Sequence, residues 1–507
     1  MTRLGGARPS SPIEHFVNSG ECAVERTDTQ AQATGLVPAA SPSIAQKVFY
    51  SLGQAAQSGG FDTAVGFVFF YYSAVLGLSG TLIGAALAVG LVFDALVDPA
   101  IGSWSDNLKS RLGRRLPLMI VSIPPTVICV GLLFSPPAGL SQPLLFAWLA
   151  AFSIAARCAI SLFHVPYVAL GAELTTDYAA RTSVVVYRSA AGVLAGLVIT
   201  ALGYTAFFAD GGLQRAESYP GFGWSAAGVL FVCMSACCLG LWRYAAALPQ
   251  PERVAEPMWR RMPSEVVEIF ANRSFRLLFI SAVITYVAQG LNATLNQHSF
   301  VFVWLIKSEN IQFISYAFVV GLLLGVGSAP KIQARLEKKT VVLIGLSLLI
   351  ANWLVMQGAW LAGIYSPVGE AALLPMQINS FVAGVGLGFV SVAYPSMMAD
   401  AADEHEHLFG RRREGLYFAG LGFANKAAVA VGVFIAGRAL DVIRFPADLA
   451  KNPGAVLPDD VKVQLVWVWG PIPAVIAVIS MVIFASYGIT RARHAAIAAA
   501  LRPSGGG

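Results

Sequence analysis

Charged residues are unusually few in this 507-residue sequence. Lysine, arginine, aspartate and glutamate make up only 12% of the residues, whereas 56% are hydrophobic and the mean hydropathy is +0.66. Soluble globular domains carry about 25% charged residues, so the composition excludes a soluble globular protein. Apolar runs long enough to span a bilayer become the main feature to look for.

Cysteine is also scarce, and its spacing excludes a cysteine-based metal site. Three of the six cysteines, Cys233, Cys237 and Cys238, lie within one apolar run, and no CxxC pair occurs. We interpret the cysteines as small packed residues and expect no cofactor.

The first 43 residues lack a long apolar run and are instead rich in proline, serine, threonine, glutamine and charge. This pattern excludes a cleavable signal peptide, which needs an apolar core. Residues 1–43 are therefore predicted to be a disordered cytoplasmic segment.

Beyond residue 43, apolar runs follow one another closely. We count twelve, six on each side of a polar stretch at residues 249–273. Their expected bounds are 44–77, 79–105, 116–136, 142–173, 183–209, 222–248, 275–304, 310–332, 340–364, 370–401, 415–443 and 463–490. A helix of about 20 residues crosses a bilayer, so each run is long enough. The sequence predicts an all-α membrane protein with an N-terminal six-helix bundle (44–248), a cytoplasmic central loop (249–273), a pseudo-symmetric C-terminal six-helix bundle (274–490) and a cytoplasmic tail (491–507).

Basic residues gather in alternate loops, which predicts the orientation in the membrane. The loops on this side carry Lys109, Arg111, Arg114, Arg115, Arg181, Arg253, Arg260, Arg261, Arg273, Arg276, Lys331, Arg335, Lys338, Lys339, Arg411, Arg412, Arg413, Arg491 and Arg493. The opposite loops are short or nearly neutral. By the positive-inside rule both termini are cytoplasmic in a multi-pass cell-membrane protein. The net charge of +6 then signals orientation in the lipid bilayer, and no nucleic-acid partner is expected.

Two carboxylates interrupt the second apolar run. If this helix ends near Asp106, Asp94 lies about 18 Å from that end, at roughly 1.5 Å per residue, which is near the middle of a hydrocarbon core about 30 Å thick. Asp94 and Asp98 share one helix face because they are four residues apart, and Pro99 removes the backbone partner of the Ala95 carbonyl beside them. Two such acids cannot both be ionised there without a cation. We predict the coupling-ion site of a transporter, for Na⁺ or H⁺, with no other metal.

Several motifs resemble a known family. Residues 102–106 (GSWSD) and 111–115 (RLGRR) are similar to the loop-two signature of the major facilitator superfamily. Residues 94–99 (DALVDP), 173–178 (ELTTDY) and 399–404 (ADAADE), followed by 410–415 (GRRREG), resemble the glycoside–pentoside–hexuronide:cation symporters within it. The resemblance runs from about residue 44 to 490. It implies the twelve-helix major facilitator fold and a monomeric transport unit.

The resemblance also implies roles for individual residues. The paired acids of the family's cation site correspond to Asp94 and Asp98, and its hydroxyl ligand corresponds to Ser161. Two embedded cations of the family, one on helix five and one on helix eleven, correspond to Arg188 and Lys426.

The family's sugar-binding residues are mostly replaced. His164 stands where the helix-four aspartate would be, and Ser58 stands where the helix-one aspartate would be, with Asp62 one turn further along. Val168 and Ser391 stand where tryptophans would be. We therefore expect the substrate cavity to contain His164, Arg188, Lys426, Ser58 and Asp62, and the resemblance implies transport without implying the family's galactoside specificity. A histidine beside an acid pair can also take up a proton near neutral pH.

Charged residues at the helix ends predict a cytoplasmic gate that closes by ion pairing. Asp403, Glu404, His405, Glu406 and His407 could suggest a metal site, but the arginines that follow favour a solvated gate network. The predicted gate residues are Asp106, Arg114, Arg115, Glu173, Asp177, Arg181, Asp400, Asp403 and Arg411.

Together these features predict cation-coupled symport of a sugar, glycoside or related small organic solute by alternating access, and not an enzyme. A transporter of lysolipids or other amphiphiles on the same fold is an open alternative, because the sugar-gripping residues are replaced. A magnesium-dependent prenyltransferase would also use Asp-xxx-Asp motifs, but it needs them together in one cytosol-facing cleft.

Overall fold

The computed structural model describes residues 42–175, 177–247, 262–411, 414–446, 449 and 456–501, and these residues form helices joined by short loops. Helices suit an apolar chain in a bilayer because they pair every backbone group internally. Side-chain caps begin several of them. Asp177 accepts a hydrogen bond from the Ala180 N–H at 2.7 Å, and Asn272 accepts one from the Ser274 N–H at 2.8 Å.

The N-terminal half runs through the first six crossings. Its elements are α2 (Ile44–Gln54), the π-helical η1 (Ala55–Asp62), α3 (Thr63–Val65), α4 (Val68–Phe70), the π-helical η2 (Tyr71–Val75), α5 (Gly80–Asn107), α6 (Leu116–Leu133), α7 (Gln142–Glu173), α8 (Tyr178–Ala201), η3 (Leu202–Phe207), η4 (Ala209–Gln214) and α9 (Ser218–Ala247).

The C-terminal half repeats the arrangement. Its elements are α10 (Met262–Ala271), α11 (Arg273–Phe302), α12 (Ser308–Arg335), α13 (Lys338–Leu361), α14 (Glu370–Phe409), α15 (Glu414–Val442), α16 (Asp459–Trp469), α17 (Pro471–Ala485) and α18 (Arg491–Leu501).

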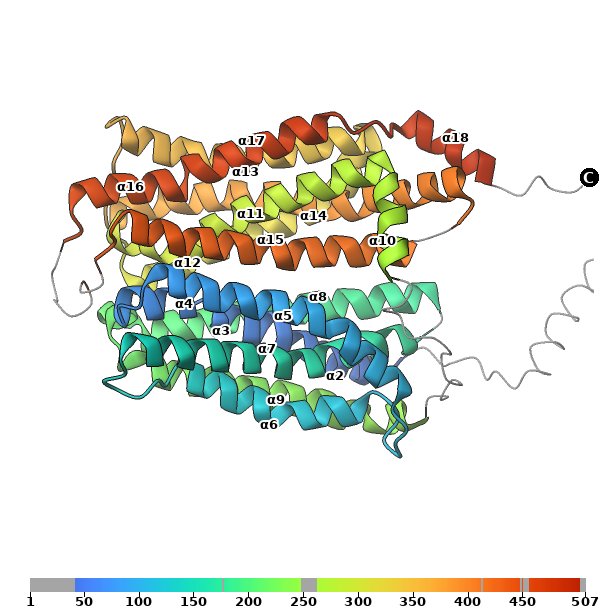
Figure 1. Cartoon of the computed structure of the whole chain (residues 1–507), viewed down its shortest axis with the longest axis horizontal. Helices are drawn as coiled ribbons and strands as arrows, with labels where there is room; N and C mark the ends of the chain where they lie inside the picture. Colours follow the sequence, from blue (N-terminus) through green and yellow to red (C-terminus); the bar gives the residue numbers. More distant parts are fainter. Residues whose placement is uncertain are drawn as a thin grey trace, which may run out of the picture.

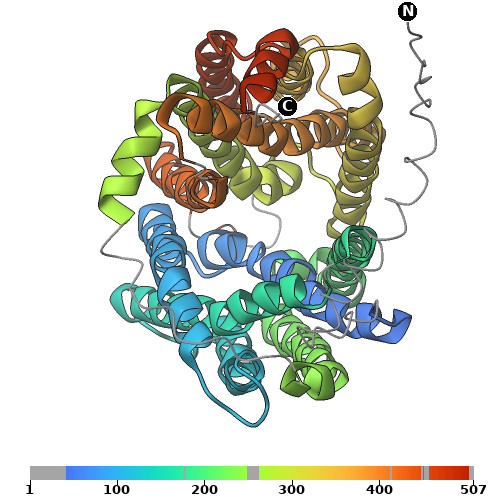
Figure 2. The same cartoon turned by 90° about the vertical axis from the view of Figure 1, so that its right-hand side faces the viewer.

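The two halves lie side by side as separate helical bundles. In Figure 1, α2–α9 occupy the lower bundle and α10–α18 the upper one, with the long helices nearly parallel. Helix α2 begins, and α18 ends, at the same end of the molecule, which we call the α18 end; the opposite end, where α4 lies, is the α4 end. Seen from the α18 end in Figure 2, the bundles face each other across a boundary, with α10 at its edge.

Eleven helices in the described part of the chain are long and apolar enough to cross a membrane. The sequence predicted twelve crossings. The predicted crossing that is not among these eleven helices is the first, because π-helical turns and short α-helical segments break it between residues 44 and 75. Glycine explains part of this irregularity: a Cβ on Gly59 would lie 2.3 Å from the Ala195 Cβ of α8. The broken helix therefore lies unusually close to α8, and π-helical turns often occur at functional sites.

A short helix lies where the sequence predicted only the central loop 249–273. Residues 248–261 fall outside the described part of the chain, but α10 follows them and α11 begins at Arg273. Ile269 of α10 is 2% exposed and packs in a cluster with Phe275 and Tyr417. This packing places α10 against α11 and α15, and a ten-residue segment is too short to give a long apolar run. The tail also contains a helix, α18.

The halves contact each other closely at the α4 end. A Cβ on Gly437 of α15 would lie 2.0 Å from the carbonyl oxygen of Gly80 at the start of α5. The Asp441 carboxylate of α15 accepts hydrogen bonds from the backbone N–H groups of Gly80 and Thr81, both at 2.8 Å. It also accepts one from Ser79 Oγ at 2.7 Å.

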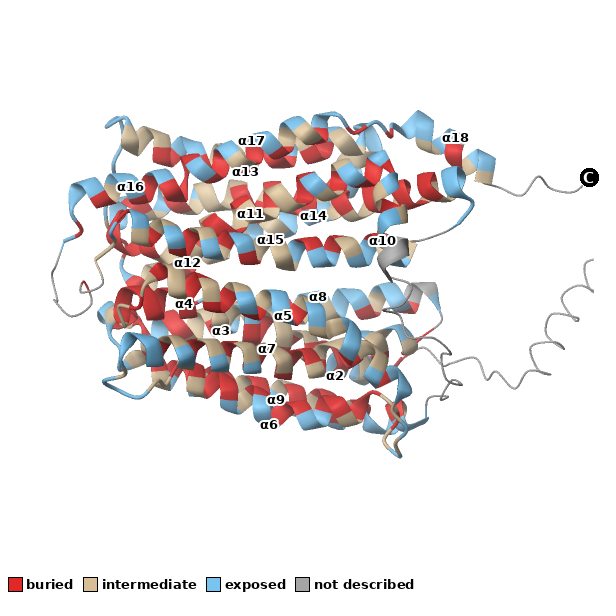
Figure 3. Ribbon diagram, in the orientation of Figure 1, coloured by how far each residue is buried: buried red, intermediate tan, exposed pale blue. Residues whose placement is uncertain are grey.

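A buried histidine adds to this contact. Ser73 Oγ of η2 hydrogen-bonds His298 Nε2 of α11 at 2.7 Å, and both side chains are buried. Figure 3 shows many buried residues around α4. The α4 end is therefore where the two halves are joined.

Candidate substrate and cation site

A cavity of about 700 Å³ lies between the two halves, at the middle of the helices. It falls within the range of roughly 300–1,000 Å³ that is usual for small-molecule sites. Both halves contribute to its walls. Its polar lining consists of Gln54, Gln57, Asp62, Asp94, Asp98, Arg157, Ser161, His164, Thr294, Asn425 and Lys426.

The predicted cation-site residues come together on one wall of this cavity. Ser161 of α7 donates a short hydrogen bond from Oγ to Oδ1 of Asp94 on α5. The two carboxylates are neighbours because a spacing of four places them on one helix face. Asp94 is 7% exposed and Ser161 is 4% exposed, so the site is largely shielded from water.

Lys426 supplies the positive charge at this wall. Its Nζ lies 2.5 Å from Oδ2 of Asp98 and 2.8 Å from Oδ2 of Asp94. Unpaired charges at mid-membrane depth are costly, so a lysine between two carboxylates stabilises all three groups. Because Lys426 belongs to α15 and the acids to α5, this contact joins the two halves through the site.

The acid pair still has unused binding capacity. Oδ1 of Asp98 is buried without a hydrogen-bond partner, although the described chain surrounds it. Pro99 follows directly inside α5 and leaves the carbonyl of Ala95 without its helical N–H partner. Carboxylate, carbonyl and hydroxyl oxygens are the ligands that a hard cation such as Na⁺ prefers. The wall can thus hold either a proton or a small cation.

The predicted substrate residues are only partly brought together. His164 and Asp62 line the cavity together with Lys426. Arg188 of α8 lies outside the lining, close enough to interact with the Tyr50 hydroxyl and with His164. Ser58 turns away, since its Oγ accepts a hydrogen bond from Gln54 Nε2 at 3.1 Å and faces Gly192 of α8.

Sequence reasoning missed Arg157. This residue lies in the middle of α7, lines the cavity, and places its guanidinium carbon 6.0 Å from the centre of the Phe61 ring. The signal was present, because a charged residue inside an apolar run is a functional candidate by default. The same rule singled out Asp94.

The predicted gate residues of the N-terminal half contact one another. Glu173 Oε1 at the end of α7 lies 2.5 Å from Arg114 Nη2 and 2.9 Å from Arg115 Nη2. Arg115 Nη2 also lies 2.6 Å from Asp106 Oδ1. Asp177 and Arg181 instead contact the backbone, Asp177 as the N-cap of α8 and Arg181 through a bond to the Thr175 carbonyl at 3.0 Å.

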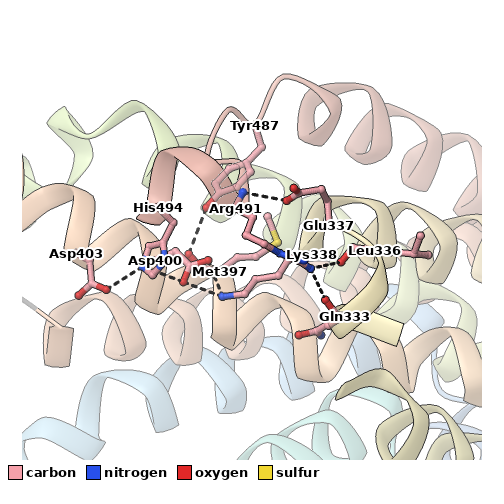
Figure 4. A network of polar contacts seen from close by, with 10 residues as sticks. All are labelled: Gln333, Leu336, Glu337, Lys338, Met397, Asp400, Asp403, Tyr487, Arg491 and His494. Atoms are coloured by element: carbon pink, nitrogen blue, oxygen red, sulfur yellow. Dashed lines mark hydrogen bonds and ion pairs between the residues drawn. The ribbon is translucent and has the colours of Figure 1, made fainter. Parts of the chain in front are cut away.

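The C-terminal half has a matching polar network at the same end (Figure 4). Lys338 Nζ lies 2.7 Å from Asp400 Oδ2, and His494 Nε2 of α18 lies 3.1 Å from Asp403 Oδ2. Arg491 Nη2 of α18 donates to the Gln333 carbonyl at 2.8 Å. Arg411 is exposed after α14. Each of these gate contacts therefore joins residues of the same half.

Tyr487 is a buried tyrosine that borders this network. Burial raises the pKa of Tyr487, which lies between α17 and α18, so its hydroxyl keeps its proton and donates to the Met397 carbonyl at 3.4 Å. Helix α18 is therefore fastened to α12, α14 and the segment before it.

Comparison with known proteins identifies the family. Residues 49–491 match the family described as MFS/sugar transport protein. An uncharacterised symporter of Synechocystis is 25% identical, with 89% of this chain and 96% of the relative covered. The isoprimeverose transporter of Lactiplantibacillus pentosus is 23% identical, with 84% and 85% covered. The sodium-dependent lysophosphatidylcholine symporter 1 of Mus musculus is 35% identical over 120 residues, covering 23% of this chain and 22% of the relative.

A solved structure supports the fold. The crystal structure of a D-xylose–proton symporter has a TM-score of 0.60 and 12% sequence identity, and the match covers 88% of this chain and 98% of that one. The predicted all-α major facilitator fold is confirmed, and the prenyltransferase alternative is wrong, because the matched family consists of transporters. The chain belongs to the MFS/sugar transport protein family and, as the sequence resemblance predicted, is a multi-pass cell-membrane transporter and not an enzyme.

Proposed function

We propose that this protein is a secondary active transporter that couples the entry of a cation to symport of a sugar, glycoside or related small organic solute. The observation that carries the proposal is the Asp94–Asp98 pair, which lies in a cavity between the halves and is bridged by Lys426 of the opposite half. A site of this kind responds to both a cation and the relative position of the halves.

Coupling follows from the charge of the acid pair. When no cation is bound, Lys426 compensates one of the two negative charges and ties α15 to α5. A proton or Na⁺ entering among Asp94, Asp98 and Ser161 compensates the second negative charge and weakens this contact. Lys426 and the halves are then free to rearrange around a solute, as alternating access requires.

The arrangement described above corresponds in this proposal to the inward-facing state. Basic residues at the α18 end make it the cytoplasmic end, and the halves are joined at the α4 end. The gate residues at the α18 end pair within their own halves. In the outward-facing state some of these charges exchange partners across the boundary and close the cytoplasmic side.

The coupling ion is Na⁺ or H⁺, and His164 favours the proton. Its imidazole lines the same cavity as the acid pair, and its Nδ1 is buried without a partner. An imidazole nitrogen without a partner can accept a proton or a hydrogen bond. Uptake driven by Na⁺ at constant pH, with no accompanying proton flux, would contradict the proton assignment.

A lysolipid or another amphiphile is the second candidate substrate. The observation in its favour is the 35% identity over 120 residues to a lysophosphatidylcholine symporter. The polar and charged lining of the cavity favours a hydrophilic solute instead, because each buried polar group needs a partner.

The proposal is tested by uptake into sealed proteoliposomes under imposed Na⁺ and pH gradients, with neutral glycosides, uronates and lysophosphatidylcholine as solutes. Wild-type protein is expected to accumulate a solute against its gradient, and Asp94→Asn is expected to abolish accumulation while leaving the protein inserted and folded. Asp459→Asn is the matched control, because the Asp459 side chain is 96% exposed and makes only a surface pair with Lys462. Unchanged uphill uptake by Asp94→Asn would remove the assignment.

A further inference from the structure

Arg157 is a partly buried cation whose function the coupling site does not explain. Lys426 already bridges Asp94 and Asp98, whereas Nε of Arg157 is buried with no hydrogen-bond partner among the described residues. The side chain lines the cavity, so its remaining donors face space that a solute can enter.

The neighbouring helices leave room for this side chain. A Cβ on Gly90 of α5 would lie 3.3 Å from Cδ and 3.6 Å from Nε of Arg157. Because Gly90 has no side chain, the Arg157 side chain can extend close to the backbone of α5. On the other side the guanidinium lies 6.0 Å from the centre of the Phe61 ring, within cation–π range. The arginine is therefore held in position without using its hydrogen-bond donors.

Asp62 lies in the same cavity, at the end of the π-helical turn η1. It is close enough to Arg157 for their charges to interact, yet the described chain contains no ion pair within 4 Å that joins the two side chains. An acceptor and a donor thus face one space without binding each other. A solute that both donates and accepts hydrogen bonds can bridge them.

Charge balance narrows the class of solute. Five charged side chains line the cavity in the described part of the chain: Asp62, Asp94, Asp98, Arg157 and Lys426. Three carboxylates and two cations leave one net negative charge, and one bound coupling cation neutralises it. An anionic solute would leave the loaded cavity negatively charged, which is costly in a low-dielectric site.

We propose that Arg157 and Asp62 are the specificity-determining pair of the transport site and that they bind adjacent hydroxyl groups of an uncharged polyhydroxylated solute. This inference rests on the proposed symport function. The planar fork of a guanidinium donates to two neighbouring oxygens, which a lysine cannot reproduce. The Asp62 carboxylate accepts the hydroxyl protons.

The test measures solute and cation binding separately on purified, full-length protein in lipid nanodiscs. The solute probes are methyl β-D-glucopyranoside, methyl β-D-xylopyranoside, D-glucuronate and lysophosphatidylcholine. The variants are Arg157→Lys, which keeps the charge, and Asp62→Asn, which keeps the size. Arg243→Lys is the matched control, because Arg243 of α9 also lies over an aromatic ring, at 5.6 Å from Trp242, but is exposed outside the cavity.

Wild-type protein is expected to bind a neutral methyl glycoside more tightly than D-glucuronate or lysophosphatidylcholine. Arg157→Lys and Asp62→Asn are each expected to raise the solute Kd at least about tenfold, the usual effect of losing a charge-assisted hydrogen bond. The cation-induced rise in unfolding temperature should remain, which shows that each variant is folded with an intact acid pair. Arg243→Lys should stay within about twofold of the wild type.

Three outcomes overturn the inference: an unchanged solute Kd in both cavity variants, a wild-type preference for D-glucuronate or lysophosphatidylcholine, or no wild-type binding of either methyl glycoside. None of these outcomes bears on cation binding at Asp94 and Asp98. The proposed symport function fails separately, if wild-type proteoliposomes accumulate no solute under either ion gradient.

Discussion

At the scale of single residues, Lys426 acts as a cation built into the chain. Its ammonium group lies between the carboxylates of Asp94 and Asp98, where a coupling ion would also bind. An internal cation and an external one that share the same oxygens must compete. This competition explains how a site can remain stable when empty and still bind an ion.

Removing the lysine should make folding depend on the external cation. We expect Lys426→Ala to lower the free energy of unfolding by about 1–3 kcal/mol at neutral pH without Na⁺, because two buried carboxylates lose their partner. The value is reduced from that of a fully buried pair because the Lys426 side chain is 34% exposed. Acid or Na⁺ should restore stability, since either supplies positive charge to the acids.

The measurement is thermal unfolding in detergent across pH, with and without Na⁺. The double variant Asp98→Asn/Lys426→Ala is the control, because it removes one negative charge together with the positive one and should recover much of the loss. A Lys426→Ala protein as stable as the wild type under every condition would show that the acids need no internal cation.

At the scale of secondary structure, α5 links the proposed coupling site to the α4 end. Its N-terminus is capped by Asp441 of the opposite half, and Asp94 lies fourteen residues along the same helix. A carboxylate at a helix N-terminus is favourable because it satisfies free N–H groups and the helix dipole. The cap therefore stabilises the state in which the α4 end is closed.

Breaking this cap should shift the protein toward the opposite state. Asp441→Asn removes a charge-assisted contact worth about 0.5–2 kcal/mol, so the population ratio of the two states should change about twofold to thirtyfold. Spin labels on Lys109 and Arg335, exposed residues of opposite halves at the α18 end, should report a larger fraction of short distances.

Asp459→Asn is the matched control for this prediction, because Asp459 also begins a helix, α16, but pairs with Lys462 of its own half. An unchanged distance distribution in Asp441→Asn would show that the cap does not hold the α4 end closed.

At the scale of the whole molecule, the sequence specified the architecture because the bilayer constrains it strongly. A run of about 20 apolar residues has few alternatives to a spanning helix. Charged residues inside such runs stand out, as Asp94 and Asp98 do, whereas Lys426 was predicted from the family resemblance. Helices α10 and α18 are short and only partly apolar, so they gave no comparable signal.

Partners within the site were harder to predict. Which charges pair depends on how the two halves are positioned, and a pattern along one chain does not contain this information. The contact of Lys426 with both acids and the turning of Ser58 toward α8 both follow from packing between distant segments. Arg157 was recognisable in principle, but its unused donors and the space provided by Gly90 appear only in three dimensions.

The paired acids are proposed to bind the coupling cation in competition with Lys426. The most direct test is equilibrium cation binding to purified protein without solute, followed with radioactive Na⁺ at constant pH and, separately, by proton uptake. We expect one cation per wild-type molecule, tighter binding to Lys426→Ala, and loss of binding in Asp94→Asn. Undiminished cation binding by Asp94→Asn would show that the acid pair is not where the coupling cation binds.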